Sequence, residues 1–234
     1  MKVLKNNKIL LIIFGIYVVL EILNRVGIIN SYIMQIVMFG GINIIMTVSL
    51  NIINGFTGQF SIGHAGFMSV GAYSSALITT VLLNTINWPV YLQIPIFLLS
   101  LLIGGIVAAF IGFLIGIPTL KVKGDYLAIV TLGFGEIVRA VIRLIQPIGG
   151  ARGLSAIPQY TNLFWIFVFT LLAVYAARNF VNSTFGRACI SIRENEIAAE
   201  TMGIDTTKFK ILSFTFASFM AGVAGGLYAH LLTF

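Results

Sequence analysis

The sequence predicts an all-α, polytopic integral membrane protein with about seven transmembrane helices in its 234 residues. Apolar residues make up 59% of the chain and charged residues 9%, which is not the composition of a soluble domain. Between Val26 and Leu120 there is no Lys, Arg, Asp or Glu. The apolar runs are long enough for spanning helices, and they lack the strict alternation of barrel strands.

The expected spans follow these apolar runs in order. Lys2, Lys5 and Lys8 precede the first run as in a signal peptide, but no small-residue cleavage site follows, so we expect a retained first helix. The prolines fall at or near span ends, where a missing N–H is tolerated. Small residues at four-residue spacing, in 104–116 and 217–225, predict close helix packing within one bundle. The predicted spans are 9–29, 32–53, 65–83, 91–117, 126–145, 160–181 and 211–234.

The basic residues indicate the orientation of the spans, because cytoplasmic loops carry an excess of Lys and Arg. With the N-terminus inside, ten of the 14 basic residues lie on the cytoplasmic side. The other four, Arg25, Arg139, Arg143 and Arg152, lie in or near outer segments. We therefore expect one transmembrane domain over 1–234, a cytoplasmic N-terminus and a cytoplasmic loop over about 182–210.

The loop before the last span carries the strongest functional signal. Residues 186–210 hold four basic and four acidic side chains, and the segment EIAAETMG over 196–203 predicts a two-turn helix that Gly203 ends. So short a helix needs tertiary support or a partner. A surface helix of no special role and a helix gripped by a soluble protein both fit this composition. The candidate residues are Arg193, Glu194, Glu196, Ala198, Ala199, Glu200 and Gly203.

Residues 54–66, NGFTGQFSIGHAG, interrupt the apolar helices with glycines and uncharged hydrogen-bonding groups. Irregular backbone at membrane depth is tolerated only where protein buries it or water reaches it, so a broken helix lining a path and a polar turn at the membrane surface both fit. We expect His64 to be a hydrogen-bonded structural residue rather than a proton relay, because no carboxylate is near it in sequence. The candidate path residues here are Asn54, Gly55, Gln59, Ser61 and His64.

The span expected over 126–145 carries a charged pair, Glu136 and Arg139, at positions i and i+3. Glu136 lies about ten residues into the span, roughly 15 Å along the helix axis. Ionisable groups at that depth usually face a bundle interior or a wet cavity. A pair that lines the translocation path and an internal strut between helices are both compatible with this position.

Several missing patterns narrow the function. No G-x-x-x-x-G-K-[ST] motif occurs, so the chain lacks the usual loop for ATP phosphates. The single cysteine, Cys189, excludes a disulfide within these residues, and we expect neither a metal nor a cofactor. A membrane enzyme is the least favoured class, because there is no nucleophile–base pair. An ion-coupled secondary transporter that titrates Glu136 is an alternative of a different class.

Three segments together resemble the LivM-type permeases of branched-chain amino acid ABC importers: NIINGFTGQFSIGHAGFMSVGAYSSA at 51–76, KGDYLAIVTLGFGEIVRAV with the following GGARGL in 123–154, and residues 185–230. The resemblance covers nearly the whole chain after about Ser31. It implies a multi-pass permease subunit of a prokaryotic inner or plasma membrane, which forms the path for Leu, Ile and Val. The implied partners are a related second permease, two cytoplasmic ATPases, an extracytoplasmic solute-binding protein and membrane lipid, without nucleic acid.

The same likeness implies that residues 193–205 are the coupling region that docks into an ATPase groove. Glu196, Ala198, Ala199 and Gly203 take the positions of the EAA-and-glycine pattern of import permeases, with Ile197 separating the glutamate from the alanines. Urea, amide and sugar permeases of the same superfamily stay open as alternatives. Family members normally continue with a further loop and more spans, so we expect the chain to be shorter than a full permease.

Overall fold

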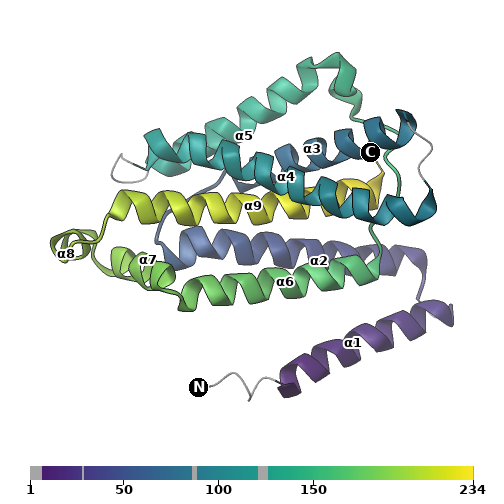
Figure 1. The fold of residues 1–234 in the computed structure, drawn as a ribbon, viewed down its shortest axis with the longest axis horizontal. Helices are drawn as coiled ribbons and strands as arrows, with labels where there is room; N and C mark the ends of the chain where they lie inside the picture. Colours follow the sequence, from purple (N-terminus) through teal and green to yellow (C-terminus); the bar gives the residue numbers. More distant parts are fainter. Residues whose placement is uncertain (1–6, 28, 86–88, 121–125, 234) are drawn as a thin grey trace.

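A computed structural model describes residues 7–27, 29–85, 89–120 and 126–233, and within these ranges the chain is helical without a β-strand (Figure 1). The all-α fold class is thus confirmed. A π-helical turn, Ile52–Phe56, extends α2, and two 3₁₀ turns, Gln146–Ile148 and Gly150–Arg152, follow α5. The α-helices are α1 (Asn7–Arg25), α2 (Ser31–Asn51), α3 (His64–Thr85), α4 (Val90–Thr119), α5 (Tyr126–Leu144), α6 (Leu163–Asn182), α7 (Thr184–Glu194), α8 (Glu196–Thr201) and α9 (Thr206–Leu232).

Each of the predicted spans corresponds to one long helix. Successive long helices run alternately away from and towards the end of the bundle where α7 and α8 lie (Figure 1). Among the described residues, four helical stretches are long and apolar enough to cross a membrane, namely 31–56, 91–119, 163–182 and 206–232. The chain is therefore a multi-pass membrane protein, and the count of seven crossings stays a prediction.

Helix α9 forms the centre of the bundle. It packs against α2, α3 and α4, and 67% of its most apolar stretch is buried, against 17% for α6. A Cβ placed on Gly71 of α3 would lie 2.2 Å from the carbonyl oxygen of Gly222 in α9, and one on Gly225 would lie 1.9 Å from the oxygen of Met68. The small residues therefore bring helix backbones into contact, where dispersion replaces the hydrophobic drive that lipid removes.

Polar side chains set the beginnings of the later helices. Asn162, Ser183, Asn195 and Asp205 each accept a hydrogen bond from a backbone N–H in the turn that follows, at 3.0–3.3 Å. These caps satisfy N–H groups that have no partner inside a helix, so a new helix can begin directly after the previous one. As a result α7, which was not predicted from the sequence, and α8 are separate helices with only Asn195 between them.

Candidate functional site

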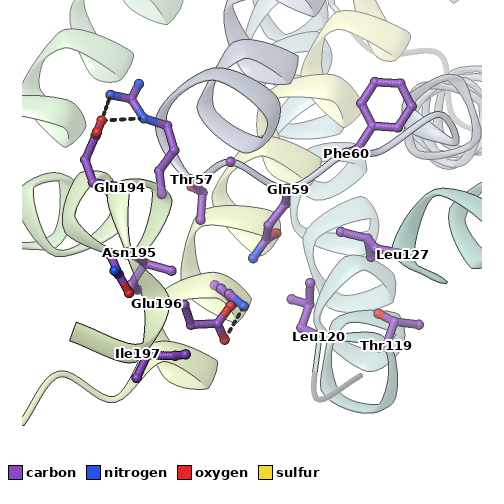
Figure 2. A pocket seen from close by; sticks show the side chains of 14 residues that line it. Thr57, Gln59, Phe60, Thr119, Leu120, Leu127, Glu194, Asn195, Glu196 and Ile197 are labelled. Atoms are coloured by element: carbon purple, nitrogen blue, oxygen red, sulfur yellow. Dashed lines mark hydrogen bonds and ion pairs between the residues drawn. The ribbon is translucent and has the colours of Figure 1, made fainter. Parts of the chain in front are cut away.

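A cavity of about 600 Å³ lies at the end of the bundle that carries α7 and α8 (Figure 2). Its walls come from four parts of the chain: residues 57–60, the facing ends of α4 and α5, the junction of α7 and α8, and Lys210 of α9. Two segments that the sequence marked separately, 54–66 and 193–205, therefore meet at one place.

Arg193 connects α7 to the turn that follows α2. Its Nη1 donates to the carbonyl oxygen of Gly55 at 2.9 Å, and its Nε donates to Glu194 Oε1 at 3.1 Å. Gly58 has φ +72°, and a Cβ there would lie 2.7 Å from Arg193 Cγ. Glycine at this position thus provides both the left-handed conformation and the space for the arginine stem.

Two polar contacts fasten α8 to the start of α9. Lys210 Nζ lies 2.7 Å from Glu196 Oε1, with the two side chains 13% and 32% exposed. Thr206 Oγ1 donates to Glu200 Oε1 at 3.0 Å, and Ala199 is buried. Because the ion pair is largely shielded from water, it is stronger than a fully exposed pair. These contacts therefore tie α8 to α9, the central helix of the bundle.

Gly203 ends α8 in a Schellman motif. Its φ is +82°, its N–H donates to the oxygen of Glu200 at 3.0 Å, and the N–H of Ile204 donates to the oxygen of Ala199 at 3.0 Å. This arrangement needs a residue that tolerates the left-handed region. Beside the motif, the side chains of Ile197 and Met202 are 70% and 82% exposed. The helix therefore presents apolar side chains at its surface while its acidic residues are bound to α9.

We expect Gly203→Ala to loosen α8 without a steric conflict, because no atom lies within 4 Å of the added Cβ. The left-handed conformation costs a non-glycine residue about 1–2 kcal/mol. Backbone amides of residues 196–204 should then exchange with deuterium severalfold faster than in the parent protein. Gly133→Ala, in the interior of α5 and also in open space, is the control and should change nothing in this segment. Unchanged protection in Gly203→Ala would contradict the motif's role.

Residues 54–66 close the same end of the bundle. Asn54 Oδ1 accepts from the N–H of Ser61 at 3.2 Å, and the N–H of Ile62 donates to Thr131 Oγ1 at 3.2 Å. Buried His64 forms a 2.7 Å hydrogen bond between its Nε2 and Ser49 Oγ, which fits a structural residue. The segment is thus a hydrogen-bonded turn that joins α2 to α3 and packs against the first half of α5.

Three residues of this turn have buried polar atoms without a hydrogen-bond partner among the described residues, namely both amide atoms of Gln59, Ser61 Oγ and His64 Nδ1. Gln59 is only 7% exposed. Figure 2 shows the amide pointing into the cavity. An unpaired buried amide is costly, at about 1–3 kcal/mol, and a group entering the cavity could satisfy it.

The remaining candidates, Glu136 and Arg139, lie elsewhere. They form an ion pair of 3.7 Å on α5, with side chains 67% and 60% exposed. Within the described part of the chain this pair is not a strut between helices. Arg139 instead lies on the wall of a second cavity, of about 660 Å³, between α3, α5 and residues 150–154. Arg143 and Arg152 line this cavity too, and the sequence had marked them only as outer charges.

Comparison with known proteins identifies the family. A family profile described as the permease component of branched-chain amino acid transport systems matches residues 32–234. The high-affinity branched-chain amino acid permeases LivM of Salmonella typhimurium and Escherichia coli K12 are 32% and 33% identical, over 80% of this chain and 50% of their own length. A nucleoside ABC transporter permease, NupC of Lactococcus lactis, is 24% identical over 75% of this chain and 60% of its own. No solved structure matches.

The chain thus spans about half the length of the LivM relatives. The profile covers every helix from α2 to α9, including α7, α8 and the glycines of the bundle centre. The chain belongs to the family of permease components of branched-chain amino acid transport systems.

Proposed function

We propose that this chain is the membrane-spanning permease subunit of an ATP-driven importer and forms part of the path for leucine, isoleucine and valine. The observation that carries the proposal is the family match over residues 32–234, supported by two relatives named for branched-chain amino acid transport. The chain has no phosphate-binding loop of its own, so partner ATPases supply the nucleotide chemistry.

In this proposal, α7 and α8 are the docking element for those ATPases, and their end of the bundle faces the cytoplasm. The excess of basic residues on that side supports this orientation. Ile197 and Met202 offer apolar contacts to a partner, and the unpaired amide of Gln59 offers a hydrogen-bonding group inside the adjoining cavity. A related second permease covers the charged face of α5, because exposed Glu136 and Arg139 are costly against lipid.

Nucleotide-driven closure of the ATPases moves α8, and two connections carry this movement into the membrane. The pair Glu196–Lys210 transmits it to α9, which packs on α2, α3 and α4. The hydrogen bond from Arg193 to Gly55 transmits it to the end of α2. The permease subunit thereby switches the path between outward- and inward-facing states, while a solute-binding protein delivers the amino acid.

The test is uptake of labelled leucine into liposomes that hold this chain with its second permease and ATPases, with the loaded binding protein outside. We expect uptake that needs ATP inside the liposomes and persists without proton or sodium gradients. The same assay with labelled urea and with a labelled sugar tests the two alternative substrate classes. Uptake driven by an ion gradient without ATP would show a secondary transporter, and uptake of urea or sugar without leucine would overturn the substrate assignment.

A further inference from the structure

The second cavity is a groove that follows one face of α3. The α3 residues that line it recur every three or four positions and so share one face of the helix. They are Ala65, Met68, Ser69, Ala72, Tyr73 and Ala76. From Ala65 to Ala76 the helix rises about 16 Å along its axis. The groove therefore runs along much of the helix, and its volume of about 660 Å³ is within the range of small-molecule sites.

The groove exists because α5 diverges from α3. The start of α3 touches the first half of α5: a Cβ on Gly63, just before α3, would lie 1.8 Å from the oxygen of Thr131, and one on Gly66 would lie 3.2 Å from the Cα of Gly135. Towards the other end α5 rises away from α3 (Figure 1). Residues 150–154 and Tyr228 complete the wall. The groove is thus narrow on the side of the docking helices and wide on the opposite side.

The wide end is positively charged. Arg139, Arg143 and Arg152 line the groove, and within the part of the chain that the structure describes Glu136 pairs with Arg139 alone, at 3.7 Å. Among the described residues, neither Arg143 nor Arg152 has an acidic partner. Both side chains are exposed at this end of the bundle, so their guanidinium groups are free to bind an anion. The neighbouring wall is apolar, with Met68, Ala72, Ile142, Leu154 and Ile157.

We propose that this groove is a passage for the amino acid and that Arg143 and Arg152 bind the substrate carboxylate at its wide mouth. A guanidinium group donates two parallel hydrogen bonds to a carboxylate, so these residues suit that group better than a lysine would. The apolar wall then accepts the branched side chain. This inference rests on the proposed function for the identity of the substrate, whereas the anion selectivity of the groove stands without it.

The first experiment measures that selectivity without transport. Ala72→Cys places a thiol on the groove wall of the assembled importer in membrane vesicles, and anionic and cationic methanethiosulfonates are compared as reagents. The native Cys189 should not react with these reagents, because it is fully buried. Burial also raises the pKa of its thiol, which disfavours the reactive thiolate. We expect the anionic reagent to react about tenfold faster, relative to the two rates on free cysteine.

Removing the charges should remove this preference. The combined variant Arg143→Gln, Arg152→Gln is expected to bring the ratio of the two rates close to that of free cysteine. Arg178→Gln changes an exposed arginine of α6 outside the groove and should leave the ratio as in the parent. Equal rates in the parent, or a preference that persists in the double variant, would overturn the assignment of an anion-selective groove.

The second experiment links the groove to the substrate. At saturating loaded binding protein, the double variant should take up leucine about tenfold more slowly or worse, because each lost contact to a charge is worth more than a neutral hydrogen bond. Membrane levels and ATP hydrolysis should match the parent. Uptake at the parent rate would refute carboxylate binding and leave the proposed function intact. If the parent importer carries no leucine, the proposed function fails, and the reagent ratio still decides whether the groove selects anions.

Discussion

Gly71→Ala is expected to destabilise the protein so strongly that most of it no longer folds. The added Cβ would lie 2.2 Å from the carbonyl oxygen of Gly222 and 2.3 Å from its Cα, and backbone atoms of a central helix cannot rotate away. A Cβ on Gly104 of α4 would likewise lie 2.8 Å from the oxygen of Gly71, so three helices meet at this point. Separating them costs roughly 3 kcal/mol or more, since a close-packed interior has no space for an extra methyl group.

Thermal unfolding in detergent, followed by fluorescence-detected size exclusion, measures this effect. Gly40→Ala is the matched control, because Gly40 is in the interior of α2 and no atom lies within 4 Å of the added Cβ. The control should be neutral or slightly stabilising, by up to about 1 kcal/mol, as alanine favours the helix. A Gly71→Ala protein with the parent's midpoint would show that α3 and α9 are not in backbone contact.

Glu196→Gln is expected to uncouple ATP hydrolysis from uptake. The change removes the carboxylate 2.7 Å from Lys210 and leaves an ammonium group that is only 13% exposed without its partner. The contact between α8 and α9 then weakens by about 1–3 kcal/mol. In the reconstituted importer, leucine uptake should fall about tenfold or more while hydrolysis continues, because partner closure no longer moves the central helix.

A charge reversal tests whether the loss of uptake comes from the broken ion pair or from a general loss of structure. Glu196→Lys combined with Lys210→Glu restores opposite charges at the same two positions and should recover part of the uptake that either single variant loses. Glu21→Gln is the control, since Glu21 pairs with Arg25 in an exposed contact on α1, away from the docking helices. Full uptake in Glu196→Gln and Lys210→Gln would show that this pair does not couple α8 to α9.

Much of the helical architecture could be predicted from local patterns. Apolar runs of about 20 residues predicted each long helix, with ends within about five residues of those observed. Gly203 predicted the end of α8, because its left-handed conformation is needed directly after the helix. Helix α7 was missed because its 11 residues include polar and charged side chains and form no long apolar run. Ser183 as a cap, followed by buried Ala188, Cys189 and Ile192, was the signal that could have revealed it.

The candidate site was only partly predictable, because its contacts join residues that are far apart in the chain. Arg193 and Gly55 are 138 positions apart in the chain, and nothing local indicates that one binds the other. His64 was expected to have a hydrogen-bond partner, but only the fold identifies it as Ser49. In the sequence, Arg143 and Arg152 each resemble an ordinary surface charge. They line the proposed anion-binding groove only because α5 diverges from α3.

The sequence by itself determined that the chain is a bundle of membrane helices, where those helices lie, and which family it belongs to, because length, periodicity and capping act within a few residues. The tertiary structure alone decided that α9 is central, that the turn after α2 meets α7, and that a charged groove opens beside α3. These features depend on which glycines face one another across helices, and close approach between distant backbones is a property of the packed bundle rather than of any single segment.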